Sequence, residues 1–457
     1  MTSASKEGSS ERQPRLLRQL PAYVQANWGT LLFLLLLSFG PSLFVTYSHL
    51  VKDPDLFRFV PPFVRGMDFS ANSHLGGEYY RIATAIVEGR GFSDPFGYPS
   101  GPTAWMPPVY CYFLAGLILL IGNRFVESLV VLLLKGLVLF STGLLVCEFG
   151  KDNAHRASRA SRLFFLTLLS FLNFGWLYQF THDSWLIMLL VNLILVFGYR
   201  LLQHDQSTGW YLKWGLLGGI TALTQPILSS AWFILTLWAS LRRKSRTILV
   251  ACLPFAAFVG IWVGRNHVVF DRIILVKSNL WFDVYQANCS DPDGVIDELS
   301  FGSHPYNQGP YGLFGQIGES QYLDLEREKA LACLADNPRA YLDKVLTRVQ
   351  AAGWKYYAYN PQKELPAVHR LYSLIYPLPF LSLILLLILC RRQLPIEARV
   401  VIALYALFCA PYVLMSFYGR YMVPMLGPQI LLCSWAVEQV LAKARIASGR
   451  TPSPSPS

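Results

Sequence analysis

The sequence predicts an all-α polytopic membrane protein, and three observations lead to this fold class. Of the 457 residues, 53% are hydrophobic and only 15% are charged, whereas soluble domains average roughly 25% charged residues. The apolar residues gather in long blocks, the first of which, at 29–49, carries no charge, and about 20 such residues suffice to cross a bilayer core. Clusters of Lys and Arg lie between the blocks, as expected for loops retained in the cytoplasm.

The first block, at 29–49, has a secretory signal peptide as its alternative interpretation. The residues before it are mainly polar and too many for a signal peptide, and no small-residue cleavage site follows the block. We therefore expect residues 1–28 to form a cytoplasmic tail. The net charge of +11 reports the same topology rather than a nucleic-acid partner, because the basic residues alternate with the apolar blocks.

Eleven apolar blocks follow one another, and the basic clusters indicate which of them cross the membrane. The blocks are residues 29–49, 106–122, 126–148, 163–180, 184–201, 211–224, 228–241, 247–264, 371–390, 398–416 and 421–441. If 106–122 crossed, the basic loop at 151–162 would lie outside, against the positive-inside rule. If it lies along the outer surface instead, as an amphipathic or re-entrant helix, all the basic clusters fall in the cytoplasm. About ten transmembrane helices are expected, with both termini inside.

This topology divides the chain into five parts. The tail at 1–28 is followed by a transmembrane module at 29–264, which includes an extracytoplasmic loop at 50–125. A second extracytoplasmic segment covers 265–370. Further membrane helices cover 371–441, and 442–457 is a disordered cytoplasmic tail. The second segment is expected to be mainly helical, with two amphipathic helices interrupted at Asn337-Pro338. Cys289 and Cys333 both lie in it, and they can pair only if it is extracytoplasmic and they meet.

An acidic and aromatic stretch, "HLGGEYYRIATAIVEGRGFSD" at 74–94, follows the first membrane block. Glu78 opens an expected helix, and Gly89 and Gly91 supply the positions at which it ends. An acid in the first turn interacts favourably with the helix dipole, which is the structural alternative to a chemical role. Asp68, in "RGMDFS", is a second carboxylate nearby.

Three stretches of the chain resemble the GT-C-type, polyprenyl-phosphate-dependent glycosyltransferases, which include protein O-mannosyltransferases and lipid A aminoarabinose transferases. "GEYYRIATAIVEGRGFSDPFGYPSGPTAWMPPVY" resembles their first extracytoplasmic loop. "GRNHVVFDRIILVKSN" at 264–279 is similar to the opening of the second outside domain in bacterial members, with Lys277 where Arg is more usual. "YGRYMVPM" at 418–425 is similar to an Arg-Tyr-x-x-Pro segment that enters the last span. The resemblance implies a GT-C-like bundle.

The resemblance also implies roles for individual residues. Glu78 takes the family's acidic position as general base, with Asp68 as the fallback, and Asp183, at the outer end of the fourth span, is the second carboxylate. The donor phosphate is expected to bind Arg265, Lys277 and Arg420, and the substrate is expected to contact Tyr79, Trp105, Tyr110, Asn266 and Tyr421. The alternatives are membrane anchoring: cations at the bilayer edge extend to the headgroups, interfacial aromatics form a belt, and a helix-end carboxylate is simply solvated.

The expected function is transfer of a hexosyl or pentosyl group from a polyprenyl-phosphate donor to a hydroxyl of a glycan, lipid or protein. The site would face the extracytoplasmic side of a bacterial cytoplasmic membrane. No cofactor and no nucleic acid are expected. The sequence contains no CxxC and no His/Cys cluster with zinc spacing, which argues against a structural metal, and a catalytic divalent ion, which some GT-C enzymes use, is not favoured. The alternatives are a transporter or flippase of a lipid-linked substrate, which would favour matching halves and mid-membrane charges, and an inactive scaffold.

Overall fold

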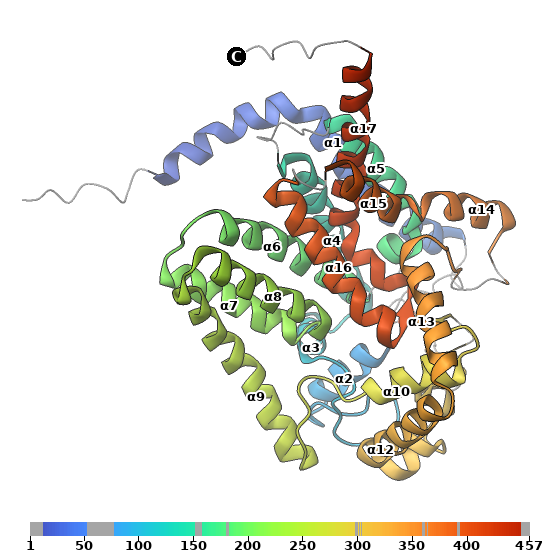
Figure 1. The fold of residues 1–457 in the computed structure, drawn as a ribbon. Helices are drawn as coiled ribbons and strands as arrows, with labels where there is room; N and C mark the ends of the chain where they lie inside the picture. Colours follow the sequence, from blue (N-terminus) through green and yellow to red (C-terminus); the bar gives the residue numbers. More distant parts are fainter. Residues whose placement is uncertain are drawn as a thin grey trace, which may run out of the picture.

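The computed structural model describes residues 12–52, 77–150, 158–179, 182–297, 300, 302, 304–358, 362, 364–390 and 394–448 (Figure 1). Within these residues, seven helices or continuous helix pairs are long and apolar enough to cross a membrane: Tyr23–Phe44, Leu129–Glu148, Ser184–Gln203, Arg246–Phe270, Pro366–Cys390, Ile396–Met415 and Gly419–Arg445. The chain is therefore an all-α polytopic membrane protein, as predicted.

The helices of the membrane bundle follow the predicted apolar blocks. They are α1 (Arg12–Lys52), α4 (Arg124–Glu148), α5 (Arg159–Leu172), the π-helical turn η2 (Gly175–Gln179), α6 (Ser184–Gln203), α7 (Thr208–Ala222), α8 (Pro226–Arg243), η3 (Arg246–Ala251), α9 (Cys252–Phe270), α14 (Pro366–Ile375), α15 (Leu378–Cys390), α16 (Ile396–Met415), η6 (Gly419–Met425) and α17 (Leu426–Ala447). The last helix continues past residue 442, where the sequence predicted the tail to begin.

The bundle is built around α6, which packs against α4, α8 and α16. Inside the bundle, the Asn192 side-chain amide donates to the Thr142 hydroxyl at 2.8 Å, so a hydrogen bond between buried side chains joins two neighbouring helices. Between α7 and α8, a glycine permits close contact: a Cβ on Gly218 would lie 2.4 Å from the Trp232 ring. Any larger residue there would separate the two helices.

The first loop forms two helices, α2 (Gly77–Val87) and α3 (Pro108–Ile121), which pack against each other. Gly89 and Gly91, which follow α2, both have positive φ angles, which confirms the predicted helix end. A 14-residue helix such as α3 is about 21 Å long, shorter than the roughly 30 Å of a bilayer core. A helix that does not cross was predicted at this position.

The second loop contains the helices α10 (Leu280–Tyr285), α11 (Pro305–Gln308), α12 (Leu313–Asp336) and α13 (Pro338–Gly353), and the π-helical turn η4 (Gln286–Ser290). The predicted interruption at Asn337-Pro338 is confirmed, and the Asn337 side chain caps α13 by accepting from the Ala340 N–H at 3.0 Å. The strand β1 (Val295–Ile296) pairs in parallel with β2 (Phe417–Tyr418). Apart from these two-residue strands, the elements of the described residues are helical.

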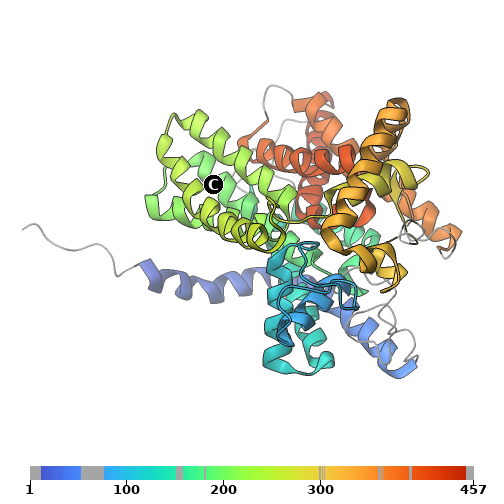
Figure 2. The ribbon, with the colours of Figure 1, turned by 90° about the horizontal axis from the view of Figure 1, so that it is seen from below.

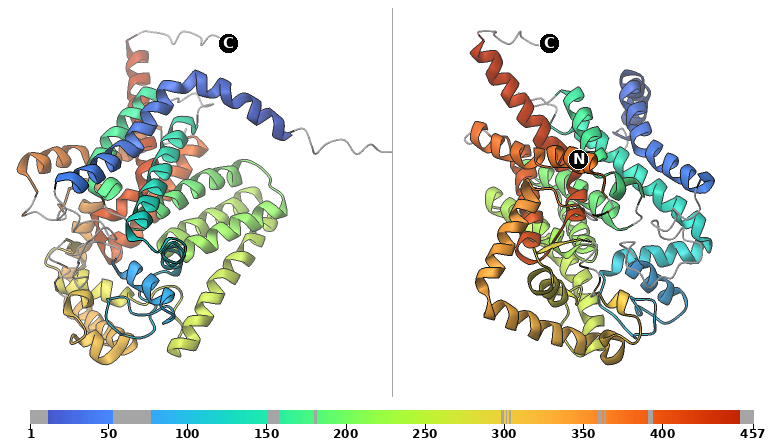
Figure 3. Two further views of the ribbon diagram at one scale, coloured as in Figure 1. Left: turned by 180° about the vertical axis from the view of Figure 1, so that it is seen from behind. Right: turned by 90° about the vertical axis from the view of Figure 1, so that its right-hand side faces the viewer.

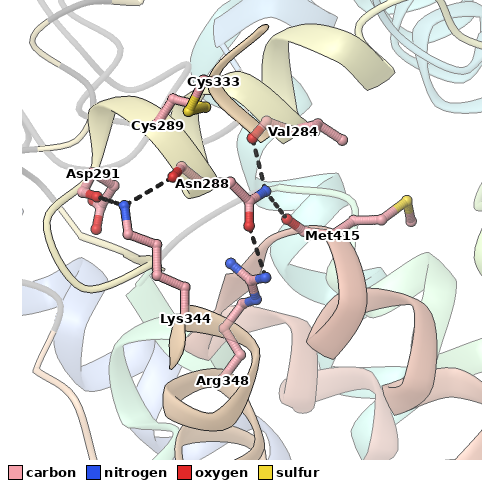
Figure 4. Close-up of a disulfide and its surroundings, with 8 residues drawn as sticks. All are labelled: Val284, Asn288, Cys289, Asp291, Cys333, Lys344, Arg348 and Met415. Carbon is pink, nitrogen blue, oxygen red and sulfur yellow. Dashed lines mark hydrogen bonds between the residues drawn. A yellow bond between two sulfur atoms is a disulfide. The ribbon is translucent and has the colours of Figure 1, made fainter. Parts of the chain in front are cut away.

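The loop helices gather at one end of the molecule. In Figure 1, α2, α10 and α12 lie at the end opposite the C-terminal end of α17, and both views of Figure 3 agree. Figure 2, seen from that end, shows the blue segments of the first loop beside the yellow and orange segments of the second. Cys289 and Cys333 form a disulfide that joins η4 to α12 (Figure 4).

Candidate functional site

A cavity of about 300 Å³ lies where the two loops meet the ends of the membrane helices. Its wall combines charged and polar groups with apolar side chains of α6, α8 and α16. The charged residues that line it are Glu78, Asp183, Lys277, Asp283 and Arg420, together with His304. Segments separated by more than 300 residues of sequence therefore share one site.

Glu78 lies in the first turn of α2 and is only 5% exposed. The glycine before it allows α11 to approach, since a Cβ on Gly77 would lie 2.7 Å from the Tyr306 hydroxyl oxygen. Glu78 Oε1 lies 3.7 Å from His304 Nε2, beyond hydrogen-bond distance. The helix and the close glycine together hold the carboxyl group at the cavity wall.

His304 caps α11, and its Nδ1 accepts from the Tyr306 N–H at 3.2 Å. An accepting Nδ1 leaves the ring proton of a neutral imidazole on Nε2, the atom that faces Glu78. Edge-to-face contacts with Phe96, Trp105 and Phe282 surround the ring. Burial lowers the pKa of His304 to about 3, so the ring is neutral near pH 7.

The Glu78 carboxyl group is tuned toward neutral pH. Burial raises its pKa to about 7, although the positive charges of Arg420 and Lys277 act in the opposite direction. A carboxylate with a pKa near the working pH is suited to accept a proton and release it again. Its structural alternative, a solvated residue that complements the helix dipole, does not explain its burial.

Asp183 lies at the start of α6, beside Tyr79 of α2, the residue that follows Glu78. The Tyr79 hydroxyl donates to Asp183 Oδ2 at 2.7 Å, and both side chains are buried. Burial raises the pKa of Asp183, while the charge of Arg420 and the Tyr79 hydrogen bond lower it. Two of the carboxyl groups in the site thus have different surroundings, because Glu78 faces a histidine and Asp183 is fixed by a tyrosine.

Two cations, Lys277 and Arg420, line the same cavity as these carboxyl groups. Lys277 Nζ lies 3.3 Å from Asp283 Oδ2. Arg420 follows β2, whose pairing with β1 ties it to the second loop. Its guanidinium carbon lies 5.0 Å from the centre of the Tyr418 ring and 5.8 Å from that of Tyr421. Two cations that line the same cavity are suited to hold an anionic group.

The other predicted substrate contacts divide into two groups. Trp105 and Tyr421 line the cavity, and the Tyr421 ring stacks on Tyr412 at 4.1 Å. Tyr110 lies behind the wall, buried edge-on against Tyr79, and does not line the cavity. Asp68 lies outside the described residues.

Arg265 and its neighbour Asn266 differ from the prediction, because both are taken up by the fold outside the cavity. The Arg265 guanidinium donates to the backbone oxygens of Phe92 at 3.0 Å and Thr103 at 2.8 Å and to Asn266 Oδ1 at 3.0 Å. The Asn266 amide donates to the Ile274 oxygen at 3.0 Å. These contacts attach the first loop to α9, and a phosphate role for Arg265 has no support here.

Sequence reasoning missed three residues of the site: His304, Asn279 and Glu319. His304 and Asn279 line the cavity, and Glu319 holds part of its wall from behind. His304 and Asn279 each precede a short helix. Neither was predicted as a site residue, although Asn279 ends the stretch 264–279 that carries the resemblance. For Glu319, the acid at the head of a helix that follows Gly318 was the available signal.

Within the described residues, no group of three or more His, Cys, Asp or Glu side chains is arranged to hold a metal ion. No protein-family model, curated protein or solved structure matches the chain.

Proposed function

We propose that the protein is a membrane glycosyltransferase that uses a polyprenyl-phosphate-linked sugar as donor. The observation that carries the proposal is one cavity containing a buried carboxyl group with a pKa near 7 and two cations. Apolar residues of α6, α8 and α16 line the same cavity, which suits an isoprenoid chain entering beside a charged headgroup.

The reaction follows from these groups. An acceptor hydroxyl attacks the anomeric carbon, and the Glu78 carboxylate takes its proton. The bond between the anomeric carbon and the phosphate oxygen breaks, and the polyprenyl phosphate leaves with the electron pair. Lys277 and Arg420 stabilise the charge that develops on that phosphate. Attack from the face opposite the leaving group inverts the anomeric centre.

Asp183 and His304 complete the proposed machinery. The neutral His304 ring presents its Nε2–H toward Glu78. It thereby favours the ionised form of the Glu78 carboxyl group, which is the form that accepts a proton. Asp183, fixed by Tyr79, is placed to accept from a hydroxyl of the sugar or of the acceptor. The acceptor itself is a glycan, lipid or protein hydroxyl.

The proposed site faces the extracytoplasmic side of a bacterial cytoplasmic membrane. The disulfide between Cys289 and Cys333 supports this side, because disulfides persist in oxidising compartments. The proposed ten crossings add α5 with η2, α7 and α8 to the seven long spans. In this topology both termini and all the basic clusters are cytoplasmic, and the whole cavity is at the outer rim.

Transfer by the purified protein tests the proposal. In detergent micelles with farnesyl-phosphoryl sugars as donors, Glu78→Gln should lower transfer by about 100- to 10,000-fold, because the amide cannot take a proton. Glu88→Gln is the matched control, since Glu88 follows the same helix and its side chain is 53% exposed. Arg420→Ala should weaken donor binding.

Two outcomes would contradict the proposal. Full activity of Glu78→Gln would remove this residue as the base. Micelles also have no compartments, so a transporter or flippase would yield no new glycosidic product at all, in the native chain or in any variant.

A further inference from the structure

Two polar atoms of the cavity wall have no hydrogen-bond partner among the described residues: the indole nitrogen Nε1 of Trp105 and the amide oxygen Oδ1 of Asn279. Trp105 is fully buried and Asn279 is 5% exposed. Buried polar groups are almost always satisfied in folded proteins. Because both residues line the cavity, a bound molecule is the natural partner of both atoms.

The two atoms belong to two loop segments that lie side by side. The Ser278 N–H donates to the Ala104 oxygen at 2.9 Å. Trp105 follows Ala104 in one segment, and Asn279 follows Ser278 in the other. This hydrogen bond holds together the two segments that carry Trp105 and Asn279, and both residues line the cavity. Lys277, on the same short segment as Asn279, contributes one of the two cations.

Glu319 holds this part of the wall from behind. Its carboxylate accepts from the Ala104 N–H at 2.9 Å and from the Ser278 hydroxyl at 2.7 Å. It also accepts from the Thr103 hydroxyl. One buried side chain of α12 thus binds both loop segments, and the positions of Trp105 and Asn279 depend on it.

The chemistry of the pair identifies its ligand. Trp105 Nε1–H only donates and Asn279 Oδ1 only accepts, so the ligand must present an acceptor to Trp105 and a donor to Asn279. A sugar hydroxyl does both, whereas a phosphate oxygen of the donor only accepts and an isoprenoid chain does neither. We propose that Trp105 and Asn279 recognise hydroxyl groups of the transferred sugar and that Glu319 is their positioning residue. This inference depends on the proposed glycosyltransferase function and adds the residues that select the sugar.

Monodeoxy sugars test the inference. A panel of farnesyl-phosphoryl hexoses and pentoses is first assayed with the native chain to find the best donor, and binding of that donor is compared with binding of each monodeoxy analogue. The native chain should lose about tenfold in affinity when the recognised hydroxyl is absent. Trp105→Phe and Asn279→Ala should each bring one such ratio close to one, because the protein partner of that hydroxyl is then missing too.

Trp232→Phe is the matched control. Trp232 is also fully buried, but its indole N–H donates to the Trp214 oxygen, away from the cavity. It should keep every ratio of the native chain. If Trp105→Phe does not fold, Asn279→Ala carries the test, because Asn279 lies at a helix start rather than within the aromatic cluster.

Glu319→Gln separates positioning from folding. An amide cannot accept from three donors as a carboxylate does, so both loop segments should become less ordered. Both ratios of donor affinity to monodeoxy-analogue affinity should then fall together. A purely structural effect would lower the thermal stability and leave the ratios of the folded fraction unchanged.

The failures of the two proposals are distinguishable. If the native chain transfers sugar but Trp105→Phe and Asn279→Ala keep its deoxy ratios, the recognition pair is wrong and the glycosyltransferase stands. If the native chain neither binds nor uses any lipid-phosphate sugar, the proposed function fails before any variant is examined, and this inference fails with it.

Discussion

At the scale of single residues, burial decides the chemistry of the site. Glu78 and Asp183 are both carboxylic acids within the same cavity, yet one faces a neutral imidazole and the other accepts from a tyrosine. Removing a carboxylate from water favours its protonated form, and nearby cations favour its charged form. In both residues the first effect exceeds the second, and the Glu78 pKa of about 7 suits a proton acceptor near neutral pH.

The first prediction concerns the pH dependence of transfer. A general base must be ionised to act, and the Glu78 pKa is about 7. We expect kcat/KM to rise about tenfold per pH unit below pH 7 and to level off above it. Initial rates with a farnesyl-phosphoryl sugar between pH 5 and 9 measure the profile. A midpoint near the ordinary glutamate pKa would assign the base to another group.

Sequence reasoning found most of the charged residues of the site. Glu78, Asp183, Lys277 and Arg420 all line the cavity, but Arg265 does not. A cation at the edge of a bilayer is visible in a sequence, whereas the direction of its side chain is not. The backbone oxygens and aromatic rings that receive the Arg265 guanidinium come from 90–104 and from its own helix, and only folding brings them together.

At the scale of elements, a buried arginine helps attach α13 to the end of α16. Figure 4 shows its contact with Asn288, whose side-chain amide donates to the oxygen of Met415, the last residue of α16. Arg348 donates to the Val413 oxygen at 2.7 Å and to the Leu414 oxygen at 3.3 Å. It also donates to Asn288 Oδ1 at 2.8 Å. The last carbonyls of a helix have no partner within it, so Arg348 satisfies the end of α16 just before the strand that leads to Arg420.

Replacing this arginine should destabilise the protein. Arg348→Met removes the donor to the Val413 oxygen and to Asn288 Oδ1 and should lower the free energy of unfolding by about 3 kcal/mol. Thermal unfolding in detergent measures the change. The matched control is Arg339→Met on the same helix, where the side chain is exposed and the effect should stay within about 0.5 kcal/mol. Equal shifts for the two variants would exclude the proposed attachment.

Apolar blocks predicted where helices occur better than they predicted helix continuity. The predicted span at 163–180 is divided between α5 and η2, and the predicted span at 371–390 falls on α14 and α15. In the second case Pro377 and Pro379 lack the N–H groups that a continuous helix requires. Hydropathy averages over such positions, so it cannot locate a break within an apolar block.

At the scale of the whole molecule, the predicted topology and the folded contacts agree at both ends of the bundle. The positions assigned to the outer side, from Glu78 and Asp183 to Gln225, Lys277 and Arg420, all line the one cavity. Positions assigned to the inner side also meet, since the Tyr199 hydroxyl donates to Glu397 Oε1 at 2.6 Å. If the chain crossed an odd number of times between any two of the outer positions, they would lie on opposite sides of the membrane.

Chemical labelling of single introduced cysteines tests this topology directly. Tyr311 is 88% exposed in the second loop, and the Asp205 side chain, between α6 and α7, is 87% exposed. In intact bacterial cells a membrane-impermeant maleimide should label Tyr311→Cys and not Asp205→Cys, whereas permeabilised cells should allow both to react. The native chain, whose described free cysteines are buried or partly buried, measures the background. Labelling of Asp205→Cys in intact cells, or protection of Tyr311→Cys there, would move the Glu78 cavity to the cytoplasmic side. An extracytoplasmic transferase would then be excluded.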